Sequence, residues 1–460
     1  MHTQIISQLR EVVGPENIST ARAELACVSY DGTAQEYLPE VVVWPSTVEE
    51  VCRIMAIAHR EKLPVVARGA GSGMTGGALP VMGGLVLAMA KFNRIIDIDQ
   101  DNQTATVEPG VVTGVLQAEV KRYGLFYPPD PASLKFCTIG GNVAEGSGGP
   151  SAVKYGVTRD YVKGLEVVLA DGRVIHTGVR TDKGVVGYDL TRLFVGSEGT
   201  LGIITKIILR LIPQPKAKRT FLVLMHSMAE AAALVAKVLS SFTPCTLEFM
   251  DRTAIGIVAD KLPVTLPAGT AAILLIELDG TAVAVAAEGA DLQEFLVGQP
   301  GVNLVRQAVD LAEAEALWAA RRAISPAAFT LRPHKMGEDV VVPRTRIPDL
   351  VACAEGLAQE LEVVVFCFGH AGDGNIHVNI MLDRADSRQV ANAEIAKQRL
   401  FTRVIELGGT LSGEHGVGIT KSSYLSMEID PATLDTMKLI KQALDPENIL
   451  NPGKIFPQNG

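Results

Sequence analysis

Residues 68–77 read RGAGSGMTGG, a glycine-rich loop between two strand-like apolar stretches, LPVVAR before it and GLVLAM after it. The loop contains G-x-G-x-x-G at Gly71, Gly73 and Gly76, the spacing of a Rossmann fingerprint. A Rossmann loop must open a helix, whereas this chain continues into another strand, so the motif does not predict a Rossmann fold. Successive glycines still let backbone N–H groups converge on an anion such as a pyrophosphate. We therefore predict a cofactor loop in a fold of a different kind.

The sequence around this loop predicts an α+β unit. Residues 41–110 read as strand, helix, strand, loop and strand, and a capping box is available at the start of the helix. A second glycine-rich zone, TIGGNVAEGSGGP, covers residues 138–150, and Asp171-Gly172 predicts a hairpin turn. Two such zones beside strand-like stretches favour a cofactor pocket over a mobile surface loop.

The second half of the chain has a different pattern. Two prolines and three basic residues interrupt the periodicity at LIPQPKAKR, residues 211–219. Residues 220–306 then alternate strand-like stretches with Ala-rich helices, which predicts a split β-α-β unit that covers a site. Residues 307–460 return to helices and strands with a dense group of His, Glu, Arg and Lys.

Composition limits the classes of partner. A chain of 460 residues is long enough for two or three packed units. It carries 42 Lys and Arg against 51 Asp and Glu, a formal net charge of −9. The basic residues are scattered and form no stripe that could neutralise phosphates, so we expect no nucleic-acid partner.

The N-terminus and the cysteines point to a cytoplasmic protein. The first residues have charges where a signal peptide needs an apolar stretch, and they read as an amphipathic helix ended by Gly14-Pro15. Apolar stretches such as AAILLIEL are shorter than the ~20 residues of a membrane-spanning helix. The six cysteines form no C-x-x-C pair and predict reduced, buried thiols. We expect no direct membrane insertion, and association with a membrane only through a partner.

Histidines crowd into two short segments near the C-terminus. Of eight in the chain, His370 and His377 lie in HAGDGNIHVN and His415 lies in GEHG. In a strand IHVNIM, His377 and Asn379 share one face, and the glycine-containing turn before the strand lets His370 return to it. A lone histidine is more often a hydrogen-bonded core residue. Two imidazoles with the Glu414 carboxylate, however, predict a divalent metal site that suits zinc and also manganese or iron.

Taken together, these motifs resemble the FAD-linked oxidases of the vanillyl-alcohol oxidase superfamily. The similar branch contains the FAD-linked subunits of glycolate oxidases, D-lactate dehydrogenases and D-2-hydroxyglutarate dehydrogenase. The likeness covers nearly the whole chain and is carried by PSTVEEV with RGAGSGMTGG, PPDPASLKFCTIGGNVAEGSGG, VGSEGTLGIIT, FGHAGDGNIHVN, SGEHGVG and NPGKIF. It implies a two-subdomain PCMH-type FAD-binding domain over residues 1–215 and a ferredoxin-like α/β cap for the substrate over 216–410. A C-terminal helical segment, 411–460, would return to the flavin and complete the active site.

The resemblance also implies which residues bind FAD. They belong to the glycine loops and to segments beside them: Arg68, Gly69, Ala70, Gly71, Ser72, Gly73, Met74, Pro129, Asp130, Pro131, Gly140, Gly141, Asn142, Gly148, Gly149, Glu198, Gly199, Ile203 and Asn451. Relatives with covalent flavin carry His followed by Ser in the first loop, where this chain has Ser72-Gly73. We therefore expect non-covalent FAD.

For the chemistry, the resemblance implies that His370, His377 and Glu414 are the metal ligands. A divalent cation would lower the pKa of a substrate hydroxyl, His415 would take its proton, and hydride would pass to flavin N5. Residues Arg321 and Lys335 correspond to substrate-contacting residues, with Asn379 on the face of His377. The spacing from Arg321 to Lys335 is one step shorter than in the D-2-hydroxyglutarate branch. Only one of Arg321 and Arg322 can point inward.

Several functions remain open. A D-lactate or glycolate dehydrogenase is favoured, and D-2-hydroxyglutarate would need a second cation from Arg322, Arg332 or Lys335. A flavin-bearing electron-transfer subunit of a glycolate or lactate oxidase complex and a non-redox relative are the alternatives. No haem or iron–sulfur motif occurs, so we expect an external acceptor, an electron-transfer flavoprotein, an iron–sulfur subunit or a quinone pathway. Self-association as a homodimer is also open.

Overall fold

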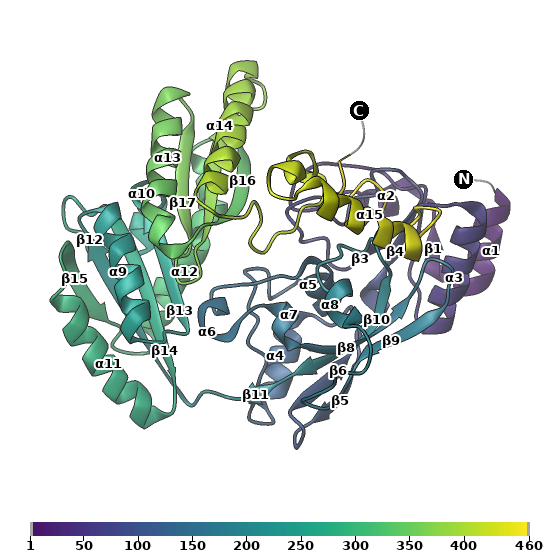
Figure 1. Cartoon of the computed structure of the whole chain (residues 1–460), viewed down its shortest axis with the longest axis horizontal. Helices are drawn as coiled ribbons and strands as arrows, with labels where there is room; N and C mark the ends of the chain where they lie inside the picture. The colour runs from purple at the N-terminus through teal and green to yellow at the C-terminus, as the bar shows by residue number, and fades with distance from the viewer. Residues whose placement is uncertain (1–2, 458–460) are drawn as a thin grey trace. The chain divides into compact units, whose positions relative to one another are not determined.

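The computed structural model describes residues 3–457, which form two compact units. Unit 1 takes residues 3–148, 157–214 and 414–457, and unit 2 takes 149–156 and 215–413. The chain therefore leaves the first unit twice, for residues 149–156 and 215–413, and its last described segment, yellow in Figure 1, belongs to unit 1 again.

A four-stranded sheet carries the first glycine loop of unit 1. Its order is β1 (Ile18–Ser19), β2 (Val41–Val43), β4 (Leu85–Ala88) and β3 (Val65–Arg68). Strands β2, β4 and β3 run parallel, and the glycine loop leads from β3 to β4 with no helix between them. The expectation that this loop does not open a Rossmann helix is confirmed.

Helix α3 (Val48–Glu61) shows how sequence spacing builds this unit. It begins at Thr47, whose Oγ1 accepts the N–H of Glu50. The buried residues Val51, Ile54, Met55 and Ala58 recur at helical spacing, so they form one apolar stripe. This stripe packs with β2, β3, β4 and α1 (Thr3–Val13) in one core.

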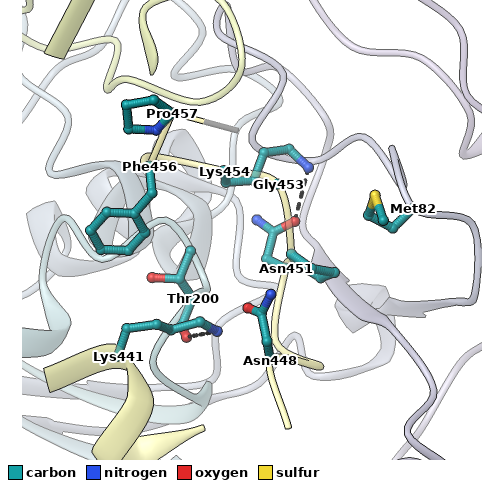
Figure 2. Close-up of a pocket in the computed structure, with 10 residues that line it drawn as sticks. Met82, Thr200, Lys441, Asn448, Asn451, Gly453, Lys454, Phe456 and Pro457 are labelled. Atoms are coloured by element: carbon teal, nitrogen blue, oxygen red, sulfur yellow. Dashed lines mark hydrogen bonds between the residues drawn. The ribbon is translucent and has the colours of Figure 1, made fainter. Parts of the chain in front are cut away.

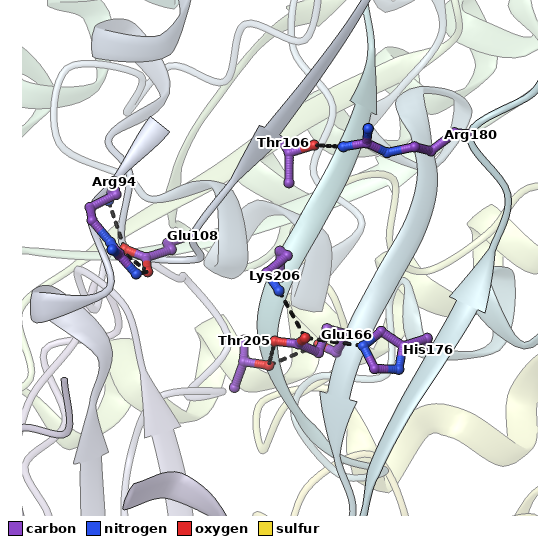
Figure 3. Close-up of polar contacts among 8 residues, drawn as sticks. All are labelled: Arg94, Thr106, Glu108, Glu166, His176, Arg180, Thr205 and Lys206. Atoms are coloured by element: carbon purple, nitrogen blue, oxygen red, sulfur yellow. Dashed lines mark hydrogen bonds and ion pairs between the residues drawn. The ribbon is translucent and has the colours of Figure 1, made fainter. Parts of the chain in front are cut away.

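A five-stranded antiparallel sheet completes unit 1, in the order β5 (Ile95–Asp99), β6 (Thr104–Val107), β10 (Ile203–Arg210), β8 (Val162–Val168) and β9 (Val174–Gly178). The predicted hairpin at Asp171-Gly172 is confirmed between β8 and β9. Side chains from neighbouring strands converge on Glu166, which accepts from Thr205 Oγ1 at 3.0 Å and Lys206 Nζ at 2.8 Å (Figure 3). These contacts stabilise a largely buried carboxylate, so the cluster is structural.

The other regular elements of unit 1 are short, apart from one helix near the C-terminus. They are α2 (Arg22–Cys27), α4 (Thr113–Lys121), β7 (Leu125–Phe126), α5 (Ile139–Glu145), α7 (Thr158–Tyr161), α8 (Leu190–Phe194), β11 (Ile212–Pro213) and α15 (Pro431–Leu444). The C-terminal segment joins the first sheet through a parallel bridge between Val65 and Leu450.

Unit 2 is built on a seven-stranded antiparallel sheet, shown in teal and green in Figure 1. The order is β15 (Val302–Gln307), β12 (Ala217–Met225), β14 (Ala272–Gly280), β13 (Thr246–Asp251), β17 (Val364–His370), β18 (Asn375–Leu382) and β16 (His334–Val341). The first four strands, with α9 (Met228–Ser241) and α11 (Ala282–Val297), form the predicted split β-α-β arrangement. Strands β17, β18 and β16 extend that sheet beyond β13, which the sequence did not indicate.

Helix α12 (Leu311–Ala327) packs on one face of this sheet. Its Leu317 and Ile324 share a core with Met250 of β13 and with Phe366 and Phe368 of β17. The remaining helices of unit 2 are α6 (Ala152–Tyr155), α10 (Arg252–Val258), α13 (Ile347–Glu360) and α14 (Ser387–Glu406).

Two expectations from composition can be compared with the fold. All six cysteines are free, and Cys137, Cys245 and Cys367 are buried. The expectation of burial is wrong for Cys27, which is exposed on the short helix α2, and Cys353 and Cys52 are only half-buried. Among the described residues, every helix is too short or too polar to span a bilayer.

Candidate active site

Arg68 stands at the end of β3, where the first glycine loop begins. Its guanidinium is buried, with 5% of the residue exposed, and its Nη2 donates to the carbonyl of Tyr30 at 2.7 Å. Its Nη1 has no hydrogen-bond acceptor among the described residues. Burial lowers the pKa of Arg68, because the charged form loses water. A buried cation with an unmet donor fits an anionic group such as the FAD diphosphate.

The glycines of the loop make room for close approach. Gly71 has φ +67°, and a Cβ there would lie 2.1 Å from Arg68 Nη2. A Cβ on Gly69 would lie 2.3 Å from Oγ1 of Thr138, the residue that begins the second glycine zone. Within unit 1, therefore, the two predicted glycine zones touch, as one cofactor cradle requires.

Two buried carboxyl groups lie beside this cradle. Burial raises the pKa of Glu198, although its carboxylate accepts the N–H groups of Val417 and Gly418, both at 2.7 Å, which acts in the opposite direction. Oε2 of Glu145 has no hydrogen-bond partner in the described part of the chain. Burial raises the pKa of Glu145, and the Glu198 carboxylate raises it further. The pKa of Glu145 is the more strongly raised of the two, and Glu198 fastens the segment that follows Glu414.

Asn451, predicted to lie near the flavin ring, is bonded to protein. Its Nδ2 donates to the carbonyls of Gly77 and Glu198 at 2.8 and 2.7 Å, and its Oδ1 accepts from Lys454 Nζ at 3.0 Å. A pocket of about 250 Å³ lies beside it, lined also by Lys441 (Figure 2). Lys454 Nζ donates to the carbonyl of Leu79, just after the glycine loop, and Lys441 Nζ donates to that of Thr200, so both lysines hold the C-terminal segment to other parts of unit 1.

Glu414 and His415 begin the part of the chain that returns to unit 1. A Cβ on Gly148 would lie 2.9 Å from Glu414 Oε2, so a predicted metal ligand lies next to a predicted flavin-pocket residue. The carbonyl of His415 accepts from Thr75 Oγ1 at 3.0 Å, beside the first glycine loop. Unit 1 thus brings the Glu414–His415 pair to the cofactor cradle.

The remaining residues predicted to bind FAD occupy three settings. Pro129 and Pro131 are buried and Asp130 is half-buried in the loop after β7, and the carbonyl of Pro129 accepts from Gln117 Nε2 at 2.9 Å. Ile203 lies in the apolar core of the first sheet. Others lie in the two glycine zones, the second of which contains helix α5, and in the turn before β10: Ala70, Ser72, Gly73, Met74, Gly140, Gly141, Asn142, Gly149 and Gly199.

In unit 2, strands β17 and β18 form the hairpin that the sequence indicated between the two histidines. His370 ends β17 and His377 lies in β18, with their ring centroids 5.2 Å apart. The backbone turn between them passes through Gly374, at φ +89°. The structure therefore brings both predicted ligands together, as expected.

Arg321 and Arg322 have opposite environments on α12. Arg321 is buried, and its Nε and Nη2 contact Glu248 Oε2 at 2.8 and 2.5 Å. Its guanidinium also lies 4.4 Å from the centre of the Phe368 ring. Arg322 is exposed and pairs with Glu315. The expectation that only one of the two points inward is confirmed, and it is Arg321.

Strand register places the other predicted side chains on the same face. Lys335 pairs with Met381, and Asp339 pairs with His377. Asn379 lies two residues beyond His377, and its Oδ1 is 3.2 Å from a Cβ built on Gly337 of β16. The amine of Lys335 donates to Ser325 Oγ at 2.6 Å, and burial lowers its pKa.

Sequence reasoning missed two buried carboxylates of this face. Glu248 Oε1 accepts from His370 Nδ1 at 2.5 Å, so the carboxylate fixes the orientation of the imidazole ring. Burial raises the pKa of Glu248, but His370 and Arg321 outweigh that effect and hold the pKa below its ordinary value. The feature of the sequence that could have revealed Glu248 is an acidic residue inside the apolar strand CTLEFM.

Asp339 is the second missed carboxylate. Its Oδ1 lies 3.6 Å from His377 Nδ1 and accepts from Asn375 Nδ2 at 2.6 Å. Its Oδ2 accepts the N–H of Gly413 at 2.9 Å, the residue that precedes Glu414 in the chain. Carboxylate and imidazole are ligand types that zinc or manganese accepts, and Asp339 and His377 belong to a group that could hold a divalent cation; His370 is not a member of that group.

Comparisons with known proteins agree with this architecture. Residues 39–178 match a family described as FAD binding domain, and residues 214–455 match FAD linked oxidases, C-terminal domain. Glycolate oxidase subunit GlcD of Bacillus subtilis is 44% identical over 454 residues, which cover 98% of this chain and 96% of that protein. D-lactate dehydrogenase of Anaerostipes hadrus is 36% identical, with 91% of this chain and 89% of that protein covered.

A solved structure, p-cresol methylhydroxylase with substrate bound, has a similar fold. Its TM-score is 0.81 at 20% identity, and the match covers 98% of this chain and 96% of that one. At this identity the likeness concerns the fold alone. The predicted α+β architecture, a PCMH-type FAD-binding domain with a second α/β domain, is confirmed.

Proposed function

The chain belongs to the FAD-linked oxidases, and on this basis we propose that it oxidises a small D-2-hydroxy acid, D-lactate or glycolate, to the 2-oxo acid. In this proposal the FAD is non-covalent and a divalent cation, zinc, manganese or iron, assists. The names of the two relatives, a glycolate oxidase subunit and a D-lactate dehydrogenase, support the substrate class.

One observation carries the proposal: a single face of the unit 2 sheet gathers the predicted reactive side chains. His370 and His377 are adjacent, Asn379 and Lys335 follow on the same face, and Arg321 lies over Phe368. A buried surface of this kind is costly for folding unless the polar groups are paired or bind a ligand. A substrate site explains why they are gathered.

Each of these side chains has a role in the proposal. Bound flavin would supply the hydride acceptor N5, and a cation held by His370, His377 and Glu414 would supply a Lewis acid. Arg321 offers its outer Nη1–Nη2 edge to the substrate carboxylate, because Glu248 occupies the Nε edge. Asn379 orients the substrate, and an imidazole nitrogen of His415 takes the hydroxyl proton.

The balance of charge favours a monocarboxylate. Glu248 balances the charge of Arg321, and Lys335 has no ion-pair partner among residues 3–457. The other candidates for a second carboxylate do not lie on this face, since Arg322 pairs with Glu315 at the surface and Arg332 is exposed. D-2-Hydroxyglutarate, which carries two carboxylates, is therefore the second choice.

An electron-transfer subunit without its own substrate chemistry is the alternative function. The word subunit in the name of the Bacillus relative supports assembly with other chains. The ordered His370–Glu248–Arg321 network favours a working site, because a lapsed site has no need to keep three buried polar groups paired. In either case an external acceptor, an electron-transfer flavoprotein, an iron–sulfur subunit or a quinone, reoxidises the flavin.

The test is dye reduction by the purified FAD-loaded protein with D-lactate, L-lactate, glycolate and D-2-hydroxyglutarate, before and after chelation. We expect activity with D-lactate or glycolate, loss after metal removal and recovery when zinc or manganese returns. Reduction by none of the four acids would support the electron-transfer alternative. Full activity after removal of the metal would contradict the role of the cation.

A further inference from the structure

Glu248 is a fully buried carboxylate at the centre of an apolar strand. It lies in β13, which also buries Leu247, Phe249 and Met250, and the side chain has no exposed surface. A carboxylate in such a place is expensive for folding unless its oxygens are fully bonded. The groups that Glu248 contacts therefore indicate the role of this residue.

Both oxygens of Glu248 are used, each by a different predicted active-site group. Oε1 contacts His370 Nδ1 at 2.5 Å, and Oε2 contacts Nε and Nη2 of Arg321 at 2.8 and 2.5 Å. One carboxylate thus joins the last residue of β17 to the middle of α12.

The contact with His370 decides which ring nitrogen binds a metal. A carboxylate oxygen can only accept, so Nδ1 carries the hydrogen and the lone pair is on Nε2. Metal-binding histidines commonly donate their second nitrogen to a carboxylate in this way, which fixes the ring and raises its basicity.

The contact with Arg321 decides which edge of the guanidinium remains. The Nε edge is occupied, and stacking on Phe368 at 4.4 Å fixes the plane. The Nη1–Nη2 edge is then held in one direction, which suits two parallel hydrogen bonds to a carboxylate.

We propose that Glu248 is a positioning residue that sets the metal-binding histidine and the substrate-binding arginine together. The proposal rests on the function proposed above, because it assumes a cation at His370. It adds that the geometry of the cation site and of the carboxylate site depends on one side chain. Loss of Glu248 should therefore weaken both kinds of binding at once.

The test compares Glu248→Ala and Glu248→Gln with a matched control, Glu277→Gln. Glu277 lies in the neighbouring strand β14 and is equally buried, but it bonds Lys218, Thr220 and Trp318 and contacts neither His370 nor Arg321. The full chain, loaded with FAD and stripped of metal, is titrated with Zn²⁺ against a chromophoric chelator. Urea unfolding of each variant gives its stability.

We expect Glu248→Ala to bind Zn²⁺ about 10- to 100-fold more weakly than the unmodified protein. Glu248→Gln keeps the volume and one acceptor, so it should fold well and lose less zinc affinity. The neutral amide of the new glutamine faces Arg321, however. The substitution should therefore raise KM for the acid more than it lowers kcat. Glu277→Gln should lose stability yet keep zinc affinity within about twofold, because a purely structural acid does not orient a ligand.

The outcomes of this test distinguish a failure of the Glu248 inference from a failure of the proposed function. Unchanged zinc affinity in both Glu248 variants would overturn the inference and leave the proposed function standing. Equal weakening in Glu277→Gln would also overturn it, since the effect would then follow stability alone. Absence of Zn²⁺ or Mn²⁺ binding by the unmodified protein would overturn both the inference and the metal role.

Discussion

At the scale of single residues, the site depends on which of two neighbouring arginines turns inward. Arg321 and Arg322 differ by one position on α12, and the helix turns about 100° per residue, so their side chains cannot share a direction. Arg321 meets Glu248 and Phe368, while Arg322 meets solvent and Glu315. Replacement of each arginine by lysine keeps the positive charge at both positions. A difference between the two variants therefore reports the local contacts of Arg321.

Arg321→Lys should lower kcat/KM for the favoured acid by roughly 30- to 1,000-fold, about 2–4 kcal/mol. Lysine cannot bridge Glu248 and a substrate carboxylate with a fixed planar fork, and the buried carboxylate is left poorly paired. Steady-state kinetics of the dye assay provide the measurement. Arg322→Lys is the control and should stay within twofold; an equal loss in both variants would contradict the assignment.

His377→Ala should remove the bound metal and leave FAD in place. His377 lies in unit 2, beside Asp339 and His370, whereas the glycine cradle belongs to unit 1. Metal analysis and the flavin absorbance of one sample measure the two outcomes together. We expect less than about a tenth of the metal content of the unmodified protein. His226→Ala, at an exposed position of the same unit, should retain its metal, and a metal-replete His377→Ala would remove this residue from the ligand set.

At the scale of elements, the proposed function depends on the glycine loop and the β17–β18 hairpin. Local spacing predicted both, because a run of glycines and a strand alternation can be read within ten residues. The loop needs its glycines for two separate reasons, a positive φ and an absent side chain. Gly71 combines both, since a Cβ would also meet the Arg68 guanidinium at 2.1 Å.

Gly71→Ala should weaken FAD binding at least tenfold. The substitution strains the backbone at φ +67° by about 1 kcal/mol or more and displaces the Arg68 guanidinium that faces the cradle. Quenching of FAD fluorescence during titration of the apoprotein measures the affinity. Gly124→Ala is matched in strain, at φ +71°, but a Cβ there meets nothing within 4 Å, so FAD affinity should not change. Equal losses of FAD affinity in the two variants would show that backbone strain alone causes the effect.

At the scale of the whole molecule, buried charge links the chain's distant segments. Glu145 ends α5, Glu198 precedes β10, and Glu198 holds the backbone at Val417 and Gly418. Three parts of the chain thus meet at one pair of carboxyl groups. Because the pKa of Glu145 is raised in the folded protein, global stability should depend on pH.

The sign follows from the raised pKa of Glu145. Between its ordinary value of 4.5 and the raised value, the folded protein holds a proton that the unfolded chain has released. The free energy of unfolding should therefore fall as pH rises above about 4.5, by up to about 1.4 kcal/mol per pH unit from this group, until the raised pKa is passed. Glu145→Gln, neutral at every pH, should flatten the slope.

Urea unfolding between pH 5 and pH 8 measures this dependence in the full chain. Glu11→Gln, at an exposed position of α1, is the control and should keep the slope of the unmodified protein. A Glu145→Gln variant with the unmodified slope would contradict the assignment of the proton to Glu145.

The sequence by itself determined the features that depend on neighbouring residues. The two glycine zones, the hairpin between His370 and His377 and the split β-α-β order all follow from local spacing, turn chemistry and strand alternation. These choices are made within a few residues, where backbone sterics and side-chain periodicity act directly.

Only the tertiary structure decided which distant groups meet. Glu248 reaches His370 across 122 positions in sequence because β13 pairs with β17, and Asn451 is bonded by Gly77 and Glu198 rather than left open. Strand pairing over such separations depends on the packing of a whole core, whose energy is the sum of many weak contacts. No local pattern encodes that sum, so the partners of buried charges became visible only in the folded chain.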